Sequence, residues 1–117
     1  MLGAIAGDII GSPFEWNNTN DRFFELCRGT RGWFRGREVT YHPKFTDDTV
    51  MTLAVARWLM SDNERNASRL IAIMQSMGRE YIDRGFAPMF KRWLQSDDPR
   101  PNNSYGNGAA MRVSPVA

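Results

Sequence analysis

One stretch of the sequence is apolar on almost every side of a helix, and it constrains the fold more than any other feature. It follows the two adjacent acids of KFTDDTVMT, and only Thr52 and Arg57 interrupt its apolar surface. The apolar positions are Val50, Met51, Leu53, Ala54, Val55, Ala56, Trp58, Leu59 and Met60. A helix that is hydrophobic all round is buried in a protein core. The sequence therefore predicts a central, largely buried helix from about Asp47 to Met60.

Another helix is predicted at the start of the chain. Gly3, Gly7 and Gly11 recur at every fourth residue, which places them on one face of a helix. We expect this glycine stripe to let another backbone approach closely. Pro13 should end the helix, because it lacks a backbone donor and disfavours helical geometry in the residue before it.

Two further helices are predicted in the second half of the chain. Apolar residues recur at helical spacing from Leu70 to about Asp83, and Gly85 is suited to a C-terminal stop. One short helix is expected from Pro88 to Leu94. Because no segment shows a convincing β alternation, the predicted class is all-α, with residues 1–117 as a single domain.

Residues 16–45 are predicted to form a long loop or flap. This segment is rich in Asn, Gly, Arg and aromatic residues and has no sustained periodicity. A loop of this length in a compact domain is more often functional than idle. His42, the only histidine, lies near its end, and we assign it no catalytic role.

The composition excludes several classes of function. Lysine and arginine total 15 against 13 acidic residues, and the resulting net charge of +2 is too small for a nucleic-acid-binding surface. No window approaches the roughly 20 apolar residues of a membrane span, and the start of the chain lacks the marks of a signal peptide. Cys27 is the only cysteine, which excludes an intrachain disulfide. We therefore expect a soluble, cytoplasmic protein.

The residues before the central helix allow two interpretations. Thr46 is suited to cap the helix, and Asp47 and Asp48 would favour the positive end of its dipole. Alternatively, two adjacent anions beside a buried helix are costly unless a cation neutralises them. Carboxylate and hydroxyl oxygens suit Mg²⁺, whereas the lack of histidine and cysteine argues against zinc. Taken alone, these residues leave both interpretations open.

The segment SYGNGAAMR, residues 104–112, is a candidate anion site. Gly106 and Gly108 lie on either side of Asn107, ahead of helix-favouring alanines. Free backbone N–H groups at a loop-to-helix junction bind phosphate, although a plain turn before a helix is the alternative. It is neither a P-loop nor a Rossmann turn, because no Gly-Lys-Ser/Thr follows and no strand precedes it. Arg112 is either a charge partner for a phosphate or an ordinary surface arginine.

Three blocks in this order, GAIAGDIIGSPFEW, FTDDTVMTLAVA and YGNGAAMRVSPVA, resemble the ADP-ribosylglycohydrolase family. The resemblance implies an orthogonal all-α fold and a centre of two Mg²⁺ ions, with Mn²⁺ as an alternative. It also implies a glycosidase-type hydrolase that releases ADP-ribose from a modified protein or a related acceptor. ADP-ribose or an ADP-ribosylated protein is then the expected partner.

The resemblance also implies roles for individual residues. Thr46, Asp47 and Asp48 match the first set of metal ligands, and Glu15 matches the acidic residue of the flap near the metals. Glu15, Asp47 and Asp48 form the predicted catalytic set. The loop that lies along ADP-ribose is matched by Gly106, Asn107, Gly108, Ala109 and Ala110, with Arg112 as a charge partner. Asp8 resembles a structural aspartate, and we assign it no chemistry.

One departure from the family pattern matters. Family members are longer, and their second set of metal ligands lies in an Asp-x-Asp-Thr motif near the C-terminus. Asp97 and Asp98 do not supply it, because Pro99 follows them and the threonine is missing. We therefore expect an N-terminal half of a family member. Its alternative role is a catalytically incomplete remnant that binds Mg²⁺ and ADP-ribose.

A third expectation is a helical fragment that forms a homo-oligomer or pairs with a missing C-terminal half. The apolar side chains expected at such a surface are Met74, Met77, Phe90 and Trp93.

Overall fold

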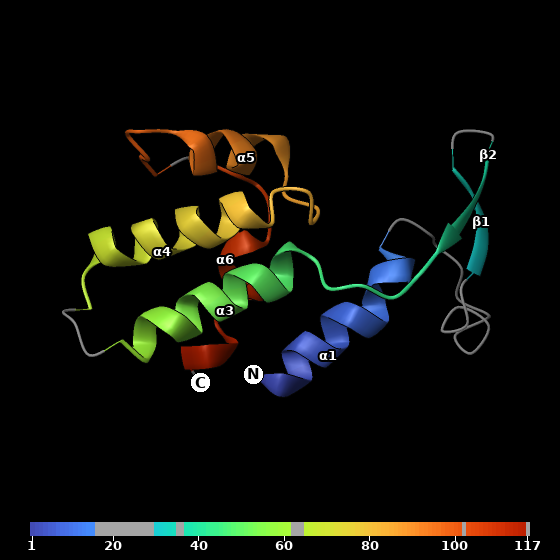
Figure 1. Ribbon diagram of the computed structural model, residues 1–117, viewed down its shortest axis with the longest axis horizontal. Coiled ribbons are helices and arrows are strands. Elements are labelled where there is room, and N and C mark those ends of the chain that lie inside the picture. Colours follow the sequence, from blue (N-terminus) through green and yellow to red (C-terminus); the bar gives the residue numbers. More distant parts are fainter. Residues whose placement is uncertain (16–29, 35–36, 62–64, 102, 117) are drawn as a thin grey trace.

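The structure, a computed structural model, describes residues 1–15, 30–34, 37–61, 65–101 and 103–116. Helix α3 (Asp47–Leu59) lies at the centre, side by side with α4 (Ala67–Glu80), and α5 (Pro88–Gln95) packs on the other side of α4 (Figure 1). The short helix α6 (Gly108–Met111) and the 3₁₀ turn η2 (Ser114–Val116) contact α3. The N-terminal helix α1 (Leu2–Gly11) also packs against α3. This helical architecture confirms the predicted class.

Helix α3 forms the core, as its apolar surface predicts. Its buried residues run from Thr49 to Thr52 and from Ala54 to Ala56. They pack with Ile73 and Met74 of α4, with Leu94 of α5 and with Phe86 before it. Burial weakens toward the C-terminal end, where the Met60 cap is 80% exposed. The predicted helix is thus confirmed, and its first three turns carry the core.

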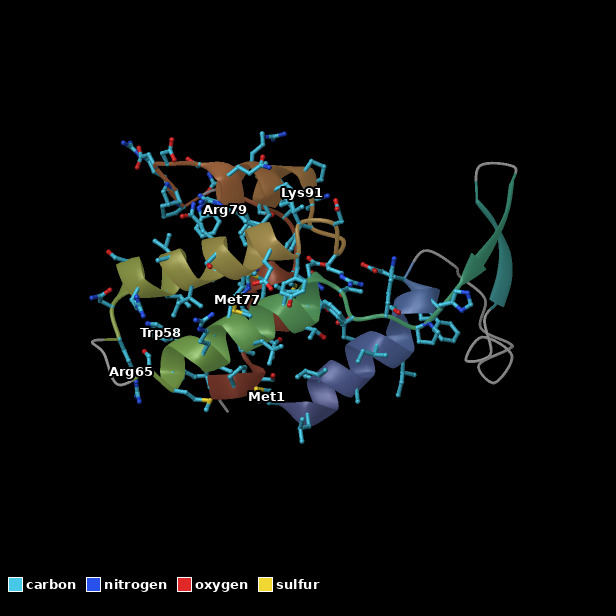
Figure 2. The ribbon with its side chains drawn as sticks, viewed as in Figure 1. Met1, Trp58, Arg65, Met77, Arg79 and Lys91 are labelled. Carbon is cyan, nitrogen blue, oxygen red and sulfur yellow. The ribbon has the colours of Figure 1, made fainter. Side chains whose placement is uncertain are left out.

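Side chains of α4 hold the end of α5. Gly78 packs so closely on Leu94 that a β-carbon there would lie 2.4 Å from Leu94 Cδ2. Gln75 donates through Nε2 to the Trp93 and Ser96 carbonyls, and Arg79 donates through Nε to the Leu94 carbonyl, at 2.6 to 3.1 Å. Arg79 lies at the interface of the two helices (Figure 2). Because the last carbonyls of a helix lack partners within it, these bonds complete α5.

Helix α1 differs from its prediction. It ends at Gly11 and continues as the 3₁₀ turn η1 (Ser12–Phe14), so Pro13 closes the α-helix as expected. None of its ten residues is buried. A β-carbon at Gly3, Gly7 or Gly11 would meet nothing within 4 Å in the described part of the chain. Among the described residues, no backbone therefore approaches the glycine stripe as expected, and Gly7 and Gly11 instead line a cavity.

The predicted loop over residues 16–45 contains a β-hairpin. Strands β1 (Thr30–Phe34) and β2 (Arg37–Tyr41) pair antiparallel, with Thr30 opposite Tyr41 and Phe34 opposite Arg37. The hairpin lies well away from α4 and α5 (Figure 1). The expectation of no strands is wrong for these residues, while residues 16–29 of the predicted loop lie outside the described part. Strand β1 contains Gly32 and places Trp33 beside Phe34, so it lacks the alternation of polar and apolar residues that would reveal a strand.

The apolar side chains predicted to lie at an exposed surface are largely covered. Met74 is buried, and Met77, Phe90 and Trp93 pack against the core cluster with Phe90 stacked on Trp93. The exposed large apolar residues lie elsewhere: Met1, Leu2, Ile10, Leu53, Met60, Met89, Tyr105, Val113 and Val116. Among the described helices, none has the length and apolar character needed to cross a membrane.

Candidate functional site

The site begins at the first turn of α3, which Thr46 caps. Thr46 has extended backbone, and its hydroxyl oxygen accepts a hydrogen bond from the Asp48 N–H at 3.3 Å. The Asp47 N–H donates to the Arg84 carbonyl at 2.7 Å. Because these bonds satisfy two donors of the helix start, the carboxylates of Asp47 and Asp48 are not needed as caps. The capping interpretation is therefore confirmed for Thr46, and Asp47 and Asp48 lie in the first turn, where the helix dipole favours their charges. The cation interpretation of the two acids stays a prediction.

Asp8 ties α1 to this turn. Its Oδ2 accepts from the Thr46 N–H at 2.8 Å and from the Thr49 N–H at 3.2 Å. The hydroxyls of Thr46 and Thr49 also donate to its carboxylate. Each oxygen of a carboxylate can accept more than one bond, so a single side chain serves four donors. The structure thus gives Asp8 the structural role that was expected for it.

A cavity of about 770 Å³ opens between α1 and the start of α3. The side of α1 contributes Gly7, Asp8, Gly11, Ser12, Phe14 and Glu15 to its wall. The remaining lining residues are Thr46, Asp47, Asp48, Gly85, Phe86, Ala87, Pro88, Asn107 and Met111. Segments that are far apart in the sequence therefore meet around the two aspartates. A volume of this size lies in the usual range for small-molecule sites.

Three acids of this cavity destabilise one another's charged forms. Burial, followed by the charge of Asp48, raises the pKa of Asp47 to about 6. Burial and the charge of Asp8 raise the pKa of Asp48, against an opposing effect of Arg112. Burial, Asp48 and Asp8 raise the pKa of the exposed Glu15 at the rim. Clustered acids with raised pKa values in a cleft are typical of functional sites.

The donors present fit a hard divalent cation. The Thr46 hydroxyl donates to Asp8 and accepts from Asp48 N–H, which leaves one lone pair of its oxygen for a cation. Two carboxylates and a hydroxyl suit Mg²⁺, which keeps several of its waters and takes few protein ligands. Within the described part of the chain, no three His, Cys, Asp or Glu side chains form a metal-binding group. The residues can therefore hold one ion partly, with water or further ligands completing its shell.

Arg112 lies near the acids, and its surroundings are unusual. Burial lowers the pKa of Arg112, while the charges of Asp47 and Asp48 raise it. Its guanidinium carbon lies 5.1 Å from the centre of the Phe90 ring, and its buried Nε has no hydrogen-bond partner among the described residues. A β-carbon at Gly108 would lie 2.8 Å from one of its terminal nitrogens. Arg112 is thus a half-buried countercharge to the aspartates, and the expectation of an ordinary surface arginine is wrong.

The predicted glycine loop reaches the cavity at one point. Asn107 caps α6 and lines the cavity, whereas Gly106, Ala109 and Ala110 are exposed and do not line it. Helix α6 is one turn long and is tied to the core by the Thr52 hydroxyl, which donates to the Met111 carbonyl at 3.3 Å. The structure therefore brings Asn107 and Met111 to the acids and leaves most of the loop on the outside.

Sequence reasoning missed one wall of the cavity. Residues 85–88, which lead into α5, line it beside Asp47, and Gly85 has a φ of +103°. A positive φ favours glycine, but Gly85 is not the predicted helix stop, because α4 ends at Glu80 with Tyr81 as its C-cap and Gly85 lies in the turn that follows. The Gly-x-x-Pro spacing was the only local signal for this wall. Its position beside Asp47 depends on the packing of α4 against α3.

Taken together, the fold and the cavity define a class, the helical proteins that gather acids at the start of a buried central helix. Comparison with known families narrows this class. The family model described as ADP-ribosylglycohydrolase matches residues 1–117, and the chain belongs to this family.

Three curated relatives carry the same name. ADP-ribosylhydrolase ARH3 of Xenopus tropicalis is 30% identical over 132 residues, which cover 97% of this chain and 36% of that protein. The human protein of this name is 30% identical over 142 residues and the mouse protein 29%, each over 100% of this chain. The chain spans little more than a third of the length of these relatives, at 36% to 37%. No solved structure matches the chain significantly.

Proposed function

We propose that this chain serves a metal-dependent hydrolase that cleaves ADP-ribose from modified proteins or related acceptors. The observation that carries the proposal is the pair Asp47 and Asp48 in the wall of a cavity of about 770 Å³, with Glu15 at its rim. The relatives named ADP-ribosylhydrolase ARH3 support the reaction class. Localisation in the cytoplasm is part of the proposal and rests on the lone Cys27.

Thr46, Asp47 and Asp48 would hold Mg²⁺, with Mn²⁺ as the alternative. When bound, such an ion fixes sugar hydroxyls and stabilises developing charge. Burial raises the pKa of both adjacent carboxyl groups, and a bound cation would stabilise their charged forms against this effect. This chain would then supply the first ligand set of a two-ion centre.

Glu15 would act as the general acid or general base of the reaction. Burial and the charges of Asp48 and Asp8 raise its pKa, which brings a carboxyl group closer to the value that suits a general acid or base near neutral pH. Its place at the rim of the cavity gives it access to both substrate and water. It would donate a proton to the departing acceptor or take one from attacking water.

Asn107 would contact the ADP-ribose moiety at the opposite side of the acids. It lines the cavity at the start of α6, and Gly85 and Pro88 line the same cavity. Arg112 would act from behind the acids, because its charge lowers the pKa of Asp48 and keeps that carboxyl ionised. The exposed Gly106, Ala109 and Ala110 and the half-buried Gly108 would contribute backbone groups where the phosphates reach the loop.

A second candidate function is binding of ADP-ribose without turnover. It is favoured by Asp97 and Asp98, the other adjacent acids, which do not line the cavity. Asp98 instead forms an exposed ion pair with Arg100 at 2.7 Å. A chain with only the first ligand set would bind a single ion and the nucleotide, and hydrolysis would need a further chain segment or a partner to complete the centre.

One experiment separates the two functions. The purified chain is incubated with an ADP-ribosylated protein and Mg²⁺, and released ADP-ribose is compared between wild type and Asp47→Asn/Asp48→Asn. The matched control is Asp97→Asn/Asp98→Asn, which alters a second adjacent pair outside the cavity. Release by wild type and control but not by the cavity variant supports hydrolysis.

Other outcomes decide against hydrolysis by this chain or against the acids assigned to it. Absence of release, together with Mg²⁺-dependent binding of ADP-ribose in a calorimeter, supports the binding function. Equal release by wild type and the cavity variant would refute the assigned acids. A chain that neither releases nor binds ADP-ribose would refute both functions.

A further inference from the structure

A tight turn, Tyr81–Phe86, connects the end of α4 to the cavity wall, and it is locked against the start of α3. The Arg84 N–H donates to the Tyr81 carbonyl at 3.0 Å, and the Arg84 carbonyl accepts from the Asp47 N–H at 2.7 Å. Phe86 at the end of the turn is only 4% exposed and belongs to the core cluster. The backbone of this turn is therefore held from both of its ends.

Phe45 adds two contacts that hold the same turn. Its ring meets the Tyr81 ring edge-on, with centroids 5.7 Å apart, and the Arg84 guanidinium lies 3.9 Å above its centre. Phe45 directly precedes the cap of α3, so these contacts join the turn to the residues that carry the acids. Aromatic and cation–π contacts of this kind stabilise a fixed geometry. The turn has little freedom to move away from Asp47.

Gly85 faces Asp47 across this locked junction. A β-carbon at position 85 would lie 3.0 Å from Asp47 Oδ1, closer than ordinary van der Waals contact. Gly85 also has a φ of +103°, which residues with a side chain rarely adopt. Because the turn is held by Phe45, Phe86 and the hydrogen bond to Asp47, the carboxylate would have to give way.

We infer that Gly85 is a positioning residue for Asp47: the missing side chain leaves the space that the Asp47 carboxylate occupies and thereby sets how that carboxylate faces the cavity. The inference rests on the proposed function, in which Asp47 is a metal ligand. Gly85 would thus influence metal affinity through Asp47, although Gly85 offers no metal ligand of its own. Residues that orient metal ligands commonly change metal affinity by about tenfold to a hundredfold when they are altered.

The test measures binding of Mn²⁺ alone to the full chain by electron paramagnetic resonance. Gly85→Ala should weaken Mn²⁺ binding by about tenfold or more, as expected for a displaced ligand. Gly3→Ala is the first control, because Gly3 lies on α1 but does not line the cavity, and a β-carbon there meets nothing within 4 Å among the described residues. Gly78→Ala is the second control, because it disturbs packing between α4 and α5, away from the cavity. Both controls should bind Mn²⁺ as wild type does.

A second measurement distinguishes positioning from general loss of stability. Thermal unfolding without metal is compared for Gly85→Ala in the wild-type and Asp47→Ala backgrounds. If Gly85 acts through Asp47, the drop in melting temperature caused by Gly85→Ala should be smaller when Oδ1 is absent, because only the backbone strain at φ +103° remains. This readout also works if Gly85→Ala binds no Mn²⁺ at all.

The outcomes separate this inference from the proposed function. Wild type that binds Mn²⁺, with Gly85→Ala binding equally well, refutes the positioning role alone. An equal drop in melting temperature in both backgrounds refutes it as well. Wild type that binds neither Mn²⁺ nor Mg²⁺ refutes the metal centre of the proposed function, and the role of Gly85 with it.

Discussion

Replacing Asp8 by alanine should separate α1 from α3, and the structure allows the cost to be worked out. The carboxylate accepts bonds from two backbone N–H groups and two hydroxyls, of Thr46 and Thr49, and both threonines are only 6% exposed. The hydroxyls can turn to other acceptors, but the two N–H groups cannot. Each buried donor left without a partner costs about 1 to 3 kcal/mol.

Loss of the Asp8 charge works in the opposite direction. Asp8 raises the pKa of Asp48 and of Glu15, so its removal relieves repulsion among the acids. Between partly solvated charges, this relief amounts to about 1 kcal/mol. The donors outweigh it, and Asp8→Ala should therefore lower the free energy of unfolding by about 2 to 4 kcal/mol. Asp8→Asn keeps one acceptor oxygen and should lose about 1 kcal/mol.

Urea unfolding followed by circular dichroism in EDTA gives the comparison. The control is Asp97→Ala, which removes the same charge at an exposed position and should leave stability unchanged within about 0.5 kcal/mol. An Asp8→Ala variant as stable as this control would refute the reasoning, because the two buried N–H groups would then have to find partners without Asp8. A larger loss for Asp8→Asn than for Asp8→Ala would also refute it.

Two further predictions concern pH and packing. The pKa of Asp47 is raised from 3.8 to about 6, so the folded state holds this proton more tightly, and without metal the stability contributed by Asp47 should fall as the pH rises from about 4 to about 6. Urea unfolding in EDTA at pH 4.5 and pH 7 should show a shallower decline for Asp47→Asn than for wild type, and an unchanged decline would contradict the raised pKa. Gly78→Ala should cost about 1 to 3 kcal/mol, because its β-carbon would lie 2.4 Å from Leu94 Cδ2 in a closely packed interface. A smaller effect of Gly78→Ala in the Leu94→Ala background than in wild type would support this cause, whereas a fully stable single variant would exclude it.

The sequence predicted correctly those elements of the fold that depend on neighbouring residues alone. The central helix and its cap at Thr46 follow from an apolar run and a side chain that can accept from the first turn. The short helix that begins at Pro88 depends likewise on the backbone preference of a single residue. These features could be read from the chain because nothing distant is needed to form them.

The features that the sequence did not reveal depend on contacts between segments that are distant in the sequence. A glycine every fourth residue in α1 permits close packing, but the sequence does not say whether a partner is there, and within the described residues none is. The structural role of Asp8 was expected correctly, but its partners could not be identified from the sequence, because its four donors lie at sequence separations of 38 and 41. The contact between Gly85 and Asp47 is of the same kind, since it follows from the packing of α4 on α3.

The bonds from Gln75 and Arg79 to the end of α5 have a consequence for how the cavity can change shape. They couple α4 and α5 into one stiff unit, and the wall formed by residues 85–88 is the bend within it. The opposite wall belongs to α1, which buries no residue and is joined to α3 chiefly through a single carboxylate. The cavity therefore has one firmly held wall, formed by residues 85–88, and one loosely held wall, formed by α1. Because α1 leads directly to Glu15, a displacement of α1 would change the distance between Glu15 and the aspartates on α3.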